Sequence, residues 1–70
     1  MEYKTIKHMS ELSDICEKTV RKRIREMKLS GAYPRECFLT NPERVEVAAF
    51  IHFNTYQKQI VSGKKFPEWR

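Results

Sequence analysis

Apolar residues recur at intervals of three and four positions in three stretches of the chain, and this spacing predicts three amphipathic helices. The stretches cover residues 6–12, 17–28 and 47–62. The residues expected on their inward faces are Ile6, Met9, Leu12, Val20, Ile24, Met27, Phe50, Phe53 and Ile60. The pattern therefore indicates a core built from three short helices.

Residues that favour helix ends separate the first two helices. Thr5 is expected to cap the first helix, because its hydroxyl can accept from the unpaired N–H groups of the first turn. Residues 13–14 (Ser-Asp) break the apolar spacing and favour a turn, after which Ile15 should point inward as an anchor. A second helix is expected to start near residues 16–17 and to end at Gly31, which suits a left-handed C-cap.

A short hairpin is expected between the second and third helices. Residues 36–40 and 44–47 read as two strands, joined by the three-residue loop Asn41-Pro42-Glu43. The expected inward side chains are Phe38, Val45 and Val47, and the expected outward ones are Arg44 and Glu46. Strands this short can supply only a two-stranded wing, and residues 3–5 are expected to form an extended lead-in.

These elements predict a small α+β fold, a winged helix-turn-helix with three helices and a two-stranded hairpin wing. Residues 1–63 would form the domain, and residues 64–70 a short basic and aromatic tail. A chain of 70 residues has a thin core, and we expect a stability of about 3–5 kcal/mol. Phe66 and Trp69 are therefore expected to fold back onto that core.

The charge of the chain is concentrated on the second helix. The net charge is +5, and residues 17–28 carry six basic and two acidic side chains, or +4 of that total. A small basic domain can bind nucleic acid, an anionic membrane surface or an acidic protein. A cluster on one helix favours nucleic acid, although a solvated basic face on an ordinary helix would show the same composition.

Other functional classes find less support. No apolar run is long enough to span a membrane, and the first residues have no signal-peptide core, so a cytoplasmic location is expected. Cys16 and Cys37 are expected to be reduced, and His8 and His52 lack metal-ligand spacing. We expect no cofactor and no enzymatic activity, because paired titratable groups near either histidine are missing.

A helix-turn-helix protein places its second helix in the major groove of DNA, and the first two turns of that helix face the bases. Arg and Lys side chains can form hydrogen bonds with guanine there. Lys18, Arg21 and Lys22 are the candidate base readers, whereas Arg25 and Lys28 lie further along and are expected to meet phosphates. The complete set of candidate DNA-contacting residues is Lys18, Thr19, Arg21, Lys22, Arg25 and Lys28 on the helix, with Arg35, Asn41 and Arg44 in the wing.

Residues 10–28, SELSDICEKTVRKRIREMK, resemble the helix-turn-helix of phage and transposon excisionases and of regulators with the mercuric-resistance-regulator fold. In those families a small residue, an apolar residue, a turn glycine, an apolar anchor, a cap and a Thr-Val pair recur. Here these places are held by Ser10, Leu12, Asp14, Ile15, Cys16 and Thr19-Val20. Asp14 thus replaces the glycine, and Cys16 replaces a serine or threonine cap.

The resemblance implies a recombination directionality factor, which binds attachment-site DNA, bends it and promotes excision by an integrase. It also implies an integrase as partner, cooperative self-association on DNA, and a tail that could contact a neighbouring copy or the integrase. Two alternatives remain open. One is a small phage or mobile-element transcription regulator with the same fold, and the other is a module that docks its basic helix on an acidic protein.

Overall fold

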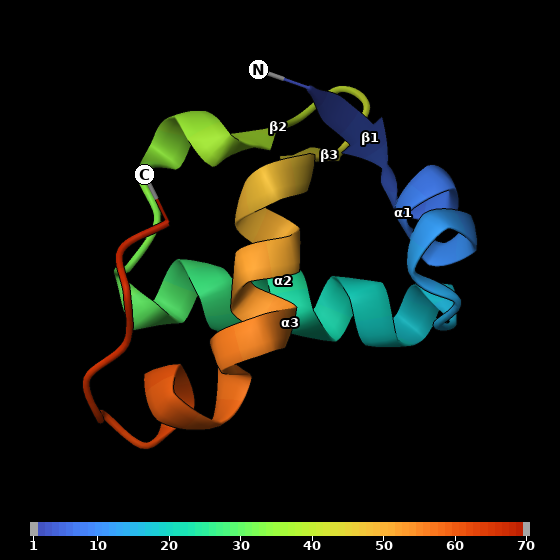
Figure 1. The fold of residues 1–70 in the computed structure, drawn as a ribbon. Coiled ribbons are helices and arrows are strands. Elements are labelled where there is room, and N and C mark those ends of the chain that lie inside the picture. Colours follow the sequence, from blue (N-terminus) through green and yellow to red (C-terminus); the bar gives the residue numbers. More distant parts are fainter. Residues whose placement is uncertain (1, 70) are drawn as a thin grey trace.

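The computed structural model describes residues 2–69, which form three α-helices and a three-stranded antiparallel sheet (Figure 1). In chain order the elements are β1 (Tyr3–Thr5), α1 (Ile6–Ser13), α2 (Glu17–Ser30), the 3-10 turn η1 (Arg35–Cys37), β2 (Phe38–Leu39), β3 (Arg44–Glu46) and α3 (Val47–Val61). The expectation of a small α+β fold with three helices is confirmed.

The helix ends follow the local sequence closely. The Thr5 hydroxyl accepts from the backbone N–H of His8 and caps α1, as expected. Asp14 ends α1 in the left-handed conformation, with φ 56° and ψ 41°. Gly31 ends α2 at φ 71°, a conformation that glycine adopts without the steric cost of a side chain.

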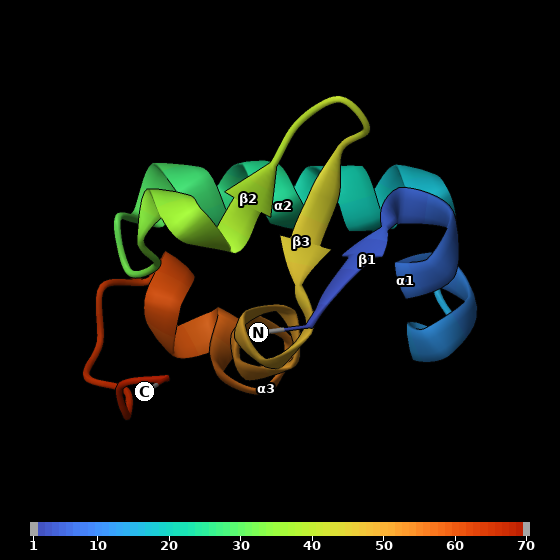
Figure 2. The same cartoon turned by 90° about the horizontal axis from the view of Figure 1, so that it is seen from above.

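The sheet has one more strand than the sequence pattern predicted. Its order is β1-β3-β2, so that β3 lies between the other two and pairs antiparallel with both (Figure 2). Tyr3 faces Glu46 in the register of β1 and β3. The expected extended lead-in is therefore a strand, and the prediction of a two-stranded wing was wrong.

The hairpin is also shorter than expected. Residues 35–37 form η1 instead of the start of a strand, and β2 contains only Phe38 and Leu39. The connection between β2 and β3 consequently spans residues 40–43. Within it, Asn41 has a positive φ of 60°, and the Asn41–Pro42 peptide bond is cis.

Glu46 was expected to face outward, and that prediction was wrong: only 4% of the residue is exposed. Its Oε2 accepts from the backbone N–H of Ala49 at 2.7 Å and so caps α3, which starts directly after β3. A carboxylate at a helix N-terminus is favoured by the helix dipole and by the unpaired N–H groups there. Val47, which the sequence assigned both to the end of the second strand and to the start of the third helix, is the first residue of α3.

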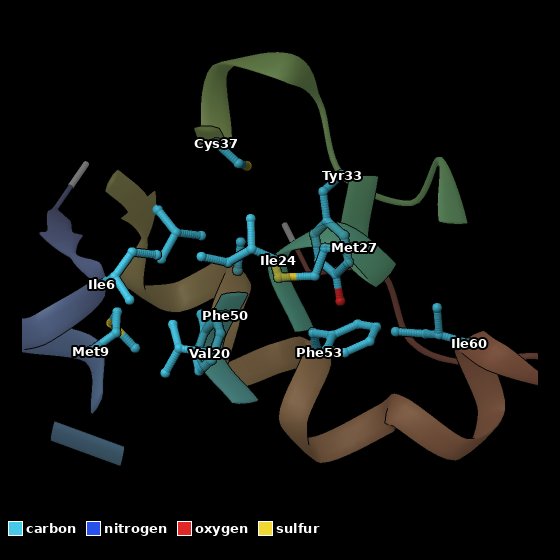
Figure 3. Packing of buried hydrophobic residues seen from close by; sticks show 12 residues of the cluster. Ile6, Met9, Val20, Ile24, Met27, Tyr33, Cys37, Phe50, Phe53 and Ile60 are labelled. Atoms are coloured by element: carbon cyan, nitrogen blue, oxygen red, sulfur yellow. The ribbon is translucent and has the colours of Figure 1, made fainter. Parts of the chain in front are cut away.

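The core lies where the three helices and β3 meet (Figure 3). The buried apolar residues are Ile6, Met9, Val20, Ile24, Met27, Tyr33, Cys37, Val45, Ala49, Phe50, Phe53 and Ile60. The inward stripes expected for the second and third helices are thus confirmed. Ile15, Phe38 and Val47 are partly buried against this cluster.

Leu12 was expected to point inward, but it is 60% exposed. Each step of three residues turns an α-helix by about 300°, so a stripe at this spacing drifts backward by about 60° per step. After the two steps from Ile6 through Met9, Leu12 has turned away from the core. Ile15, beyond the turn, packs on the core instead.

The tail folds back onto the domain, as expected. Phe66 and Trp69 are partly buried and pack against the core cluster. After α3 ends at Val61, the chain turns at residues 62–63 and then runs toward the link between α2 and η1 (Figure 1). There the rings of Trp69 and Tyr33 lie with centroids 6.4 Å apart.

Candidate nucleic-acid interface

The α2 helix separates an apolar face from a basic one. Its buried residues are Val20, Ile24 and Met27. Its exposed basic residues are Lys18, Arg21, Lys22, Arg25 and Lys28. Five cations therefore lie on one continuous surface of a helix that is anchored by its other face, as the sequence predicted.

The turn before α2 is held by hydrogen bonds from small residues. The backbone N–H groups of Asp14 and Ile15 both donate to the carbonyl of Ser10. The Ser10 hydroxyl in turn donates to the carbonyl of Ile15. The three residues Asp14–Cys16 thus join α1 to α2 in a tight connection, as a helix-turn-helix requires.

Cys16 occupies the N-cap of α2, and its side chain makes no capping hydrogen bond to the helix. Its Sγ instead lies 3.1 Å from Oγ1 of Thr19. The pKa of the Cys16 thiol is lowered from its ordinary 9.0, mainly because of the hydrogen bond with the Thr19 side chain. The hydroxyl of Thr19, one of the candidate DNA-contacting residues, therefore already has a hydrogen-bonding neighbour. Within residues 2–69 no disulfide bond joins the two cysteines, of which Cys16 is exposed and Cys37 is buried.

Two arginines on α2 have different surroundings. Arg21 pairs with Glu17 one turn earlier, at 3.7 Å between Nη2 and Oε1, and both side chains are about half exposed. Exposed pairs of this kind are weak, so Arg21 remains available to a ligand. Arg23 is half-buried, and its Nη1 donates to Oδ1 of Asn54 at 2.9 Å, which ties α2 to α3.

The hairpin lies along the basic face of α2, and two clefts run between them. One, of about 200 Å³, is lined by Arg21, Ile24, Arg25, Lys28 and Glu43. The other, of about 510 Å³, is lined by Lys28, Tyr33, Arg35, Phe38 and Thr40. Lys28 lines both clefts, so the basic surface of α2 continues toward the hairpin.

The three wing residues expected to contact DNA are placed differently from one another. Arg35 lies in η1 and lines the larger cleft. Asn41 is exposed at the tip of the hairpin. Arg44 is half-buried in β3, and its Nε donates to the carbonyl of Pro42 at 3.3 Å. Of these three residues, Arg35 lines one of the two clefts described above, whereas Asn41 and Arg44 line neither of the two.

Sequence reasoning missed Phe38, Thr40 and Glu43 as parts of this surface. Phe38 was assigned to the core, yet the Nζ of Lys28 lies 5.5 Å from the centroid of its ring. Thr40 and Glu43 belong to the connection between β2 and β3, and only the fold brings them next to α2. No local pattern of apolar and polar residues could have indicated these three.

Metal-binding clusters and membrane-spanning helices are both missing from the part of the chain that the structure describes. Residues 2–69 contain no group of three or more His, Cys, Asp or Glu side chains that could hold a metal ion. No helix in that range is both long and apolar enough to cross a membrane.

Comparisons of the chain with protein-family models, with curated proteins and with solved structures gave no match. What the protein binds is therefore inferred from its own residues.

Proposed function

We propose that this protein is a sequence-specific DNA-binding protein of the winged helix-turn-helix type. The observation that carries the proposal is the exposed basic face of α2, flanked by a tight turn at one end and by the hairpin along one side. A major groove admits one α-helix, and arginine can form two hydrogen bonds with the edge of guanine. The first two turns of α2 carry Lys18, Arg21 and Lys22 for this purpose.

Within this class, we propose an architectural role like that of the excisionases. Such a protein would bind and bend attachment-site DNA, assemble cooperatively in several copies, and promote excision by an integrase. The resemblance of residues 10–28 to excisionases supports this role. A transcription regulator with the same fold is the alternative, and it would use the same face of α2.

The dependence of binding on salt tests the DNA proposal. In a fluorescence-anisotropy titration with duplex DNA, the logarithm of affinity should fall with the logarithm of salt concentration, with a slope of about −0.9 per phosphate neutralised. A flat response would overturn the proposal and favour a module that docks on an acidic protein.

Arg21→Ala tests whether α2 reads bases. We expect the variant to lose about 1–3 kcal/mol of specific binding and to relax one base preference. Lys58→Ala, at an exposed position on α3, is the control and should bind as the wild type does. Equal losses on specific and random DNA would show that Arg21 touches only phosphate.

Sedimentation with and without DNA separates the two roles. Monomers that assemble cooperatively on tandem sites are expected for the architectural factor. A dimer that is stable without DNA would favour the regulator instead.

A further inference from the structure

The larger cleft beside α2 has the chemistry of an anion site. It is formed by the last turns of α2, the link after it and β2, and it has a volume of about 510 Å³. Clefts of about 300–1,000 Å³ are typical of small-molecule sites. Its lining combines two cations, Lys28 and Arg35, with the Thr40 hydroxyl and the rings of Phe38 and Tyr33. No carboxylate from residues 2–69 lines it.

The two cations are open to a ligand. Within residues 2–69, neither Lys28 nor Arg35 forms an ion pair with a carboxylate. The smaller cleft differs, because Glu43 lies there beside the cations. Of the two clefts, the larger is therefore the one in which an anion would meet unopposed positive charge.

The ring of Phe38 positions the Lys28 ammonium group. The Nζ of Lys28 lies 5.5 Å from the centroid of the Phe38 ring, within the range of a cation–π interaction. A flexible ammonium group is thereby held at the cleft. Tyr33 is buried, and its hydroxyl is hydrogen-bonded to Nδ1 of His52 at 2.7 Å. Its ring therefore forms part of the cleft wall, and its hydroxyl is not available to a ligand.

We propose that this cleft binds the phosphate of a nucleotide, with Lys28 and Arg35 on the phosphate. Arg presents a planar fork of donors that matches phosphate oxygens, and the Thr40 hydroxyl can donate as well. In this arrangement Phe38 is a positioning residue that acts through Lys28.

Two sources could supply this ligand: a backbone phosphate of bound duplex DNA, or a free nucleotide. The first source rests on the proposed function, because it requires DNA on α2. The second does not depend on it. Two measurements with the whole chain distinguish them.

The first measurement is the salt dependence of duplex DNA binding. The double variant Lys28→Gln/Arg35→Gln removes both cations, and Lys58→Gln/Lys65→Gln removes the same charge at exposed positions outside the cleft. If the cleft holds a DNA phosphate, the first variant should lower the salt slope by about 0.9 relative to the control.

The second measurement is an NMR titration with 2′-deoxyadenosine 5′-monophosphate, with deoxyadenosine as the reference ligand. The monophosphate should shift the amide signals of Lys28, Arg35, Phe38 and Thr40, and these shifts should disappear in Lys28→Gln/Arg35→Gln. Deoxyadenosine, which lacks the phosphate, should leave them nearly unchanged.

The outcomes separate the cleft from the proposed function. A lowered slope assigns the site to the DNA backbone. Monophosphate shifts with an unchanged slope assign it to a free nucleotide. Equal slopes in both variants together with no monophosphate shifts would overturn the proposed cleft, even if the protein binds DNA. A wild type without salt-dependent DNA binding would overturn the proposed function, while the titration would still decide about the cleft.

Phe38→Leu tests the positioning role. Leucine keeps an apolar side chain at the wall but removes the π face, so the Lys28 signals should shift less with the monophosphate. The shifts at Arg35 should persist, because this residue is not held by the ring. Lys28 shifts equal to those of the wild type would show that Phe38 serves only the packing of the fold.

Discussion

The two ends of α2 are fixed in different ways. At its N-terminal end, small polar residues make short-range hydrogen bonds: Ser10 bonds to the backbone of Ile15, and Cys16 contacts Thr19. At its C-terminal end, aromatic side chains from distant segments pack together. Tyr33 meets the edges or faces of three rings there, those of His52, Phe53 and Trp69.

The aromatic end also joins the tail to the domain. Tyr33 and His52 are linked by a 2.7 Å hydrogen bond, and Nε2 of His52 lies 2.6 Å from the carbonyl of Pro67. Because that carbonyl can only accept, Nε2 carries the proton, and in the neutral ring Nδ1 accepts from the Tyr33 hydroxyl. Large aromatic rings thus hold the C-terminal end of α2. Small side chains pack at the N-terminal end, so the candidate base readers there stay exposed.

Phe53→Ala, at the aromatic end, should have the largest effect on stability. Phe53 is fully buried and packs on Tyr33, and Phe→Ala in a core costs about 3–5 kcal/mol. This is comparable to the expected stability of a domain of this size, so the variant should be largely unfolded by circular dichroism. Leu29→Ala, at a position that is 80% exposed, is the control. A folded Phe53→Ala protein would show that the aromatic end is not the main source of stability.

Tyr33→Phe should cost about 1–2 kcal/mol, because Nδ1 of His52 loses its donor while the ring packing is kept. Chemical denaturation at neutral pH measures this loss. If the free energy of unfolding did not change, water would have to replace the hydroxyl, and the ring contacts alone would hold this end of α2.

The same variant makes a prediction about alkaline pH. Burial, and to a lesser degree the charge of Cys37, raises the pKa of Tyr33 from 10.0 to about 12. The unfolded chain therefore loses the phenol proton first, and the stability linked to this group is complete below pH 10 and lost as the pH rises toward 12. Between these values the melting temperature of the wild type should fall more steeply than that of Tyr33→Phe. Parallel curves would contradict this assignment.

Ser10→Ala tests the opposite end of α2. The variant loses the hydrogen bond to the Ile15 carbonyl, and we expect a loss of about 1 kcal/mol in the free energy of unfolding. Ser13→Ala, in the last turn of α1, is the matched control. A loss as large as that of Phe53→Ala would mean that the turn contributes as much as the aromatic end.

Asp14→Gly should have the smallest effect and the opposite sign. Asp14 has φ 56°, and relief of left-handed strain, about 1–2 kcal/mol for most residues, exceeds the extra unfolded-state entropy of glycine, about 0.5–1 kcal/mol. A gain of up to about 1 kcal/mol is expected in thermal unfolding. A destabilised variant would show that the Asp14 side chain itself supports the turn.

The same contrast explains what the sequence could predict. The Thr5 and Gly31 caps, the turn and the inward stripes of α2 and α3 follow from residues within a few positions of each other, and they were predicted correctly. The contact between Tyr33 and His52 joins residues 19 positions apart, and no local pattern specifies it. The pairing of Tyr3 with Glu46 is more distant still, so β1 was missed.

Contacts between residues far apart in the sequence were also unpredictable at the candidate interface. The exposed basic side chains of α2 were predictable from helical spacing alone. The cleft was not, because Phe38 and Thr40 reach α2 only through the fold of the hairpin. Glu46 was misassigned for a related reason: a carboxylate in a strand reads as outward-facing, unless the start of the next helix supplies N–H groups to bind it.

The central position of β3 has a consequence for binding. A free two-stranded hairpin is only marginally stable in water, but here β1 covers one side of β3, and the backbone N–H of Val47 donates to the carbonyl of Glu2 at 2.9 Å. The hairpin is therefore preorganised, because its conformational entropy is lost when the chain folds. A ligand that meets this surface would not have to order it, so binding there should be accompanied by little additional loss of chain entropy.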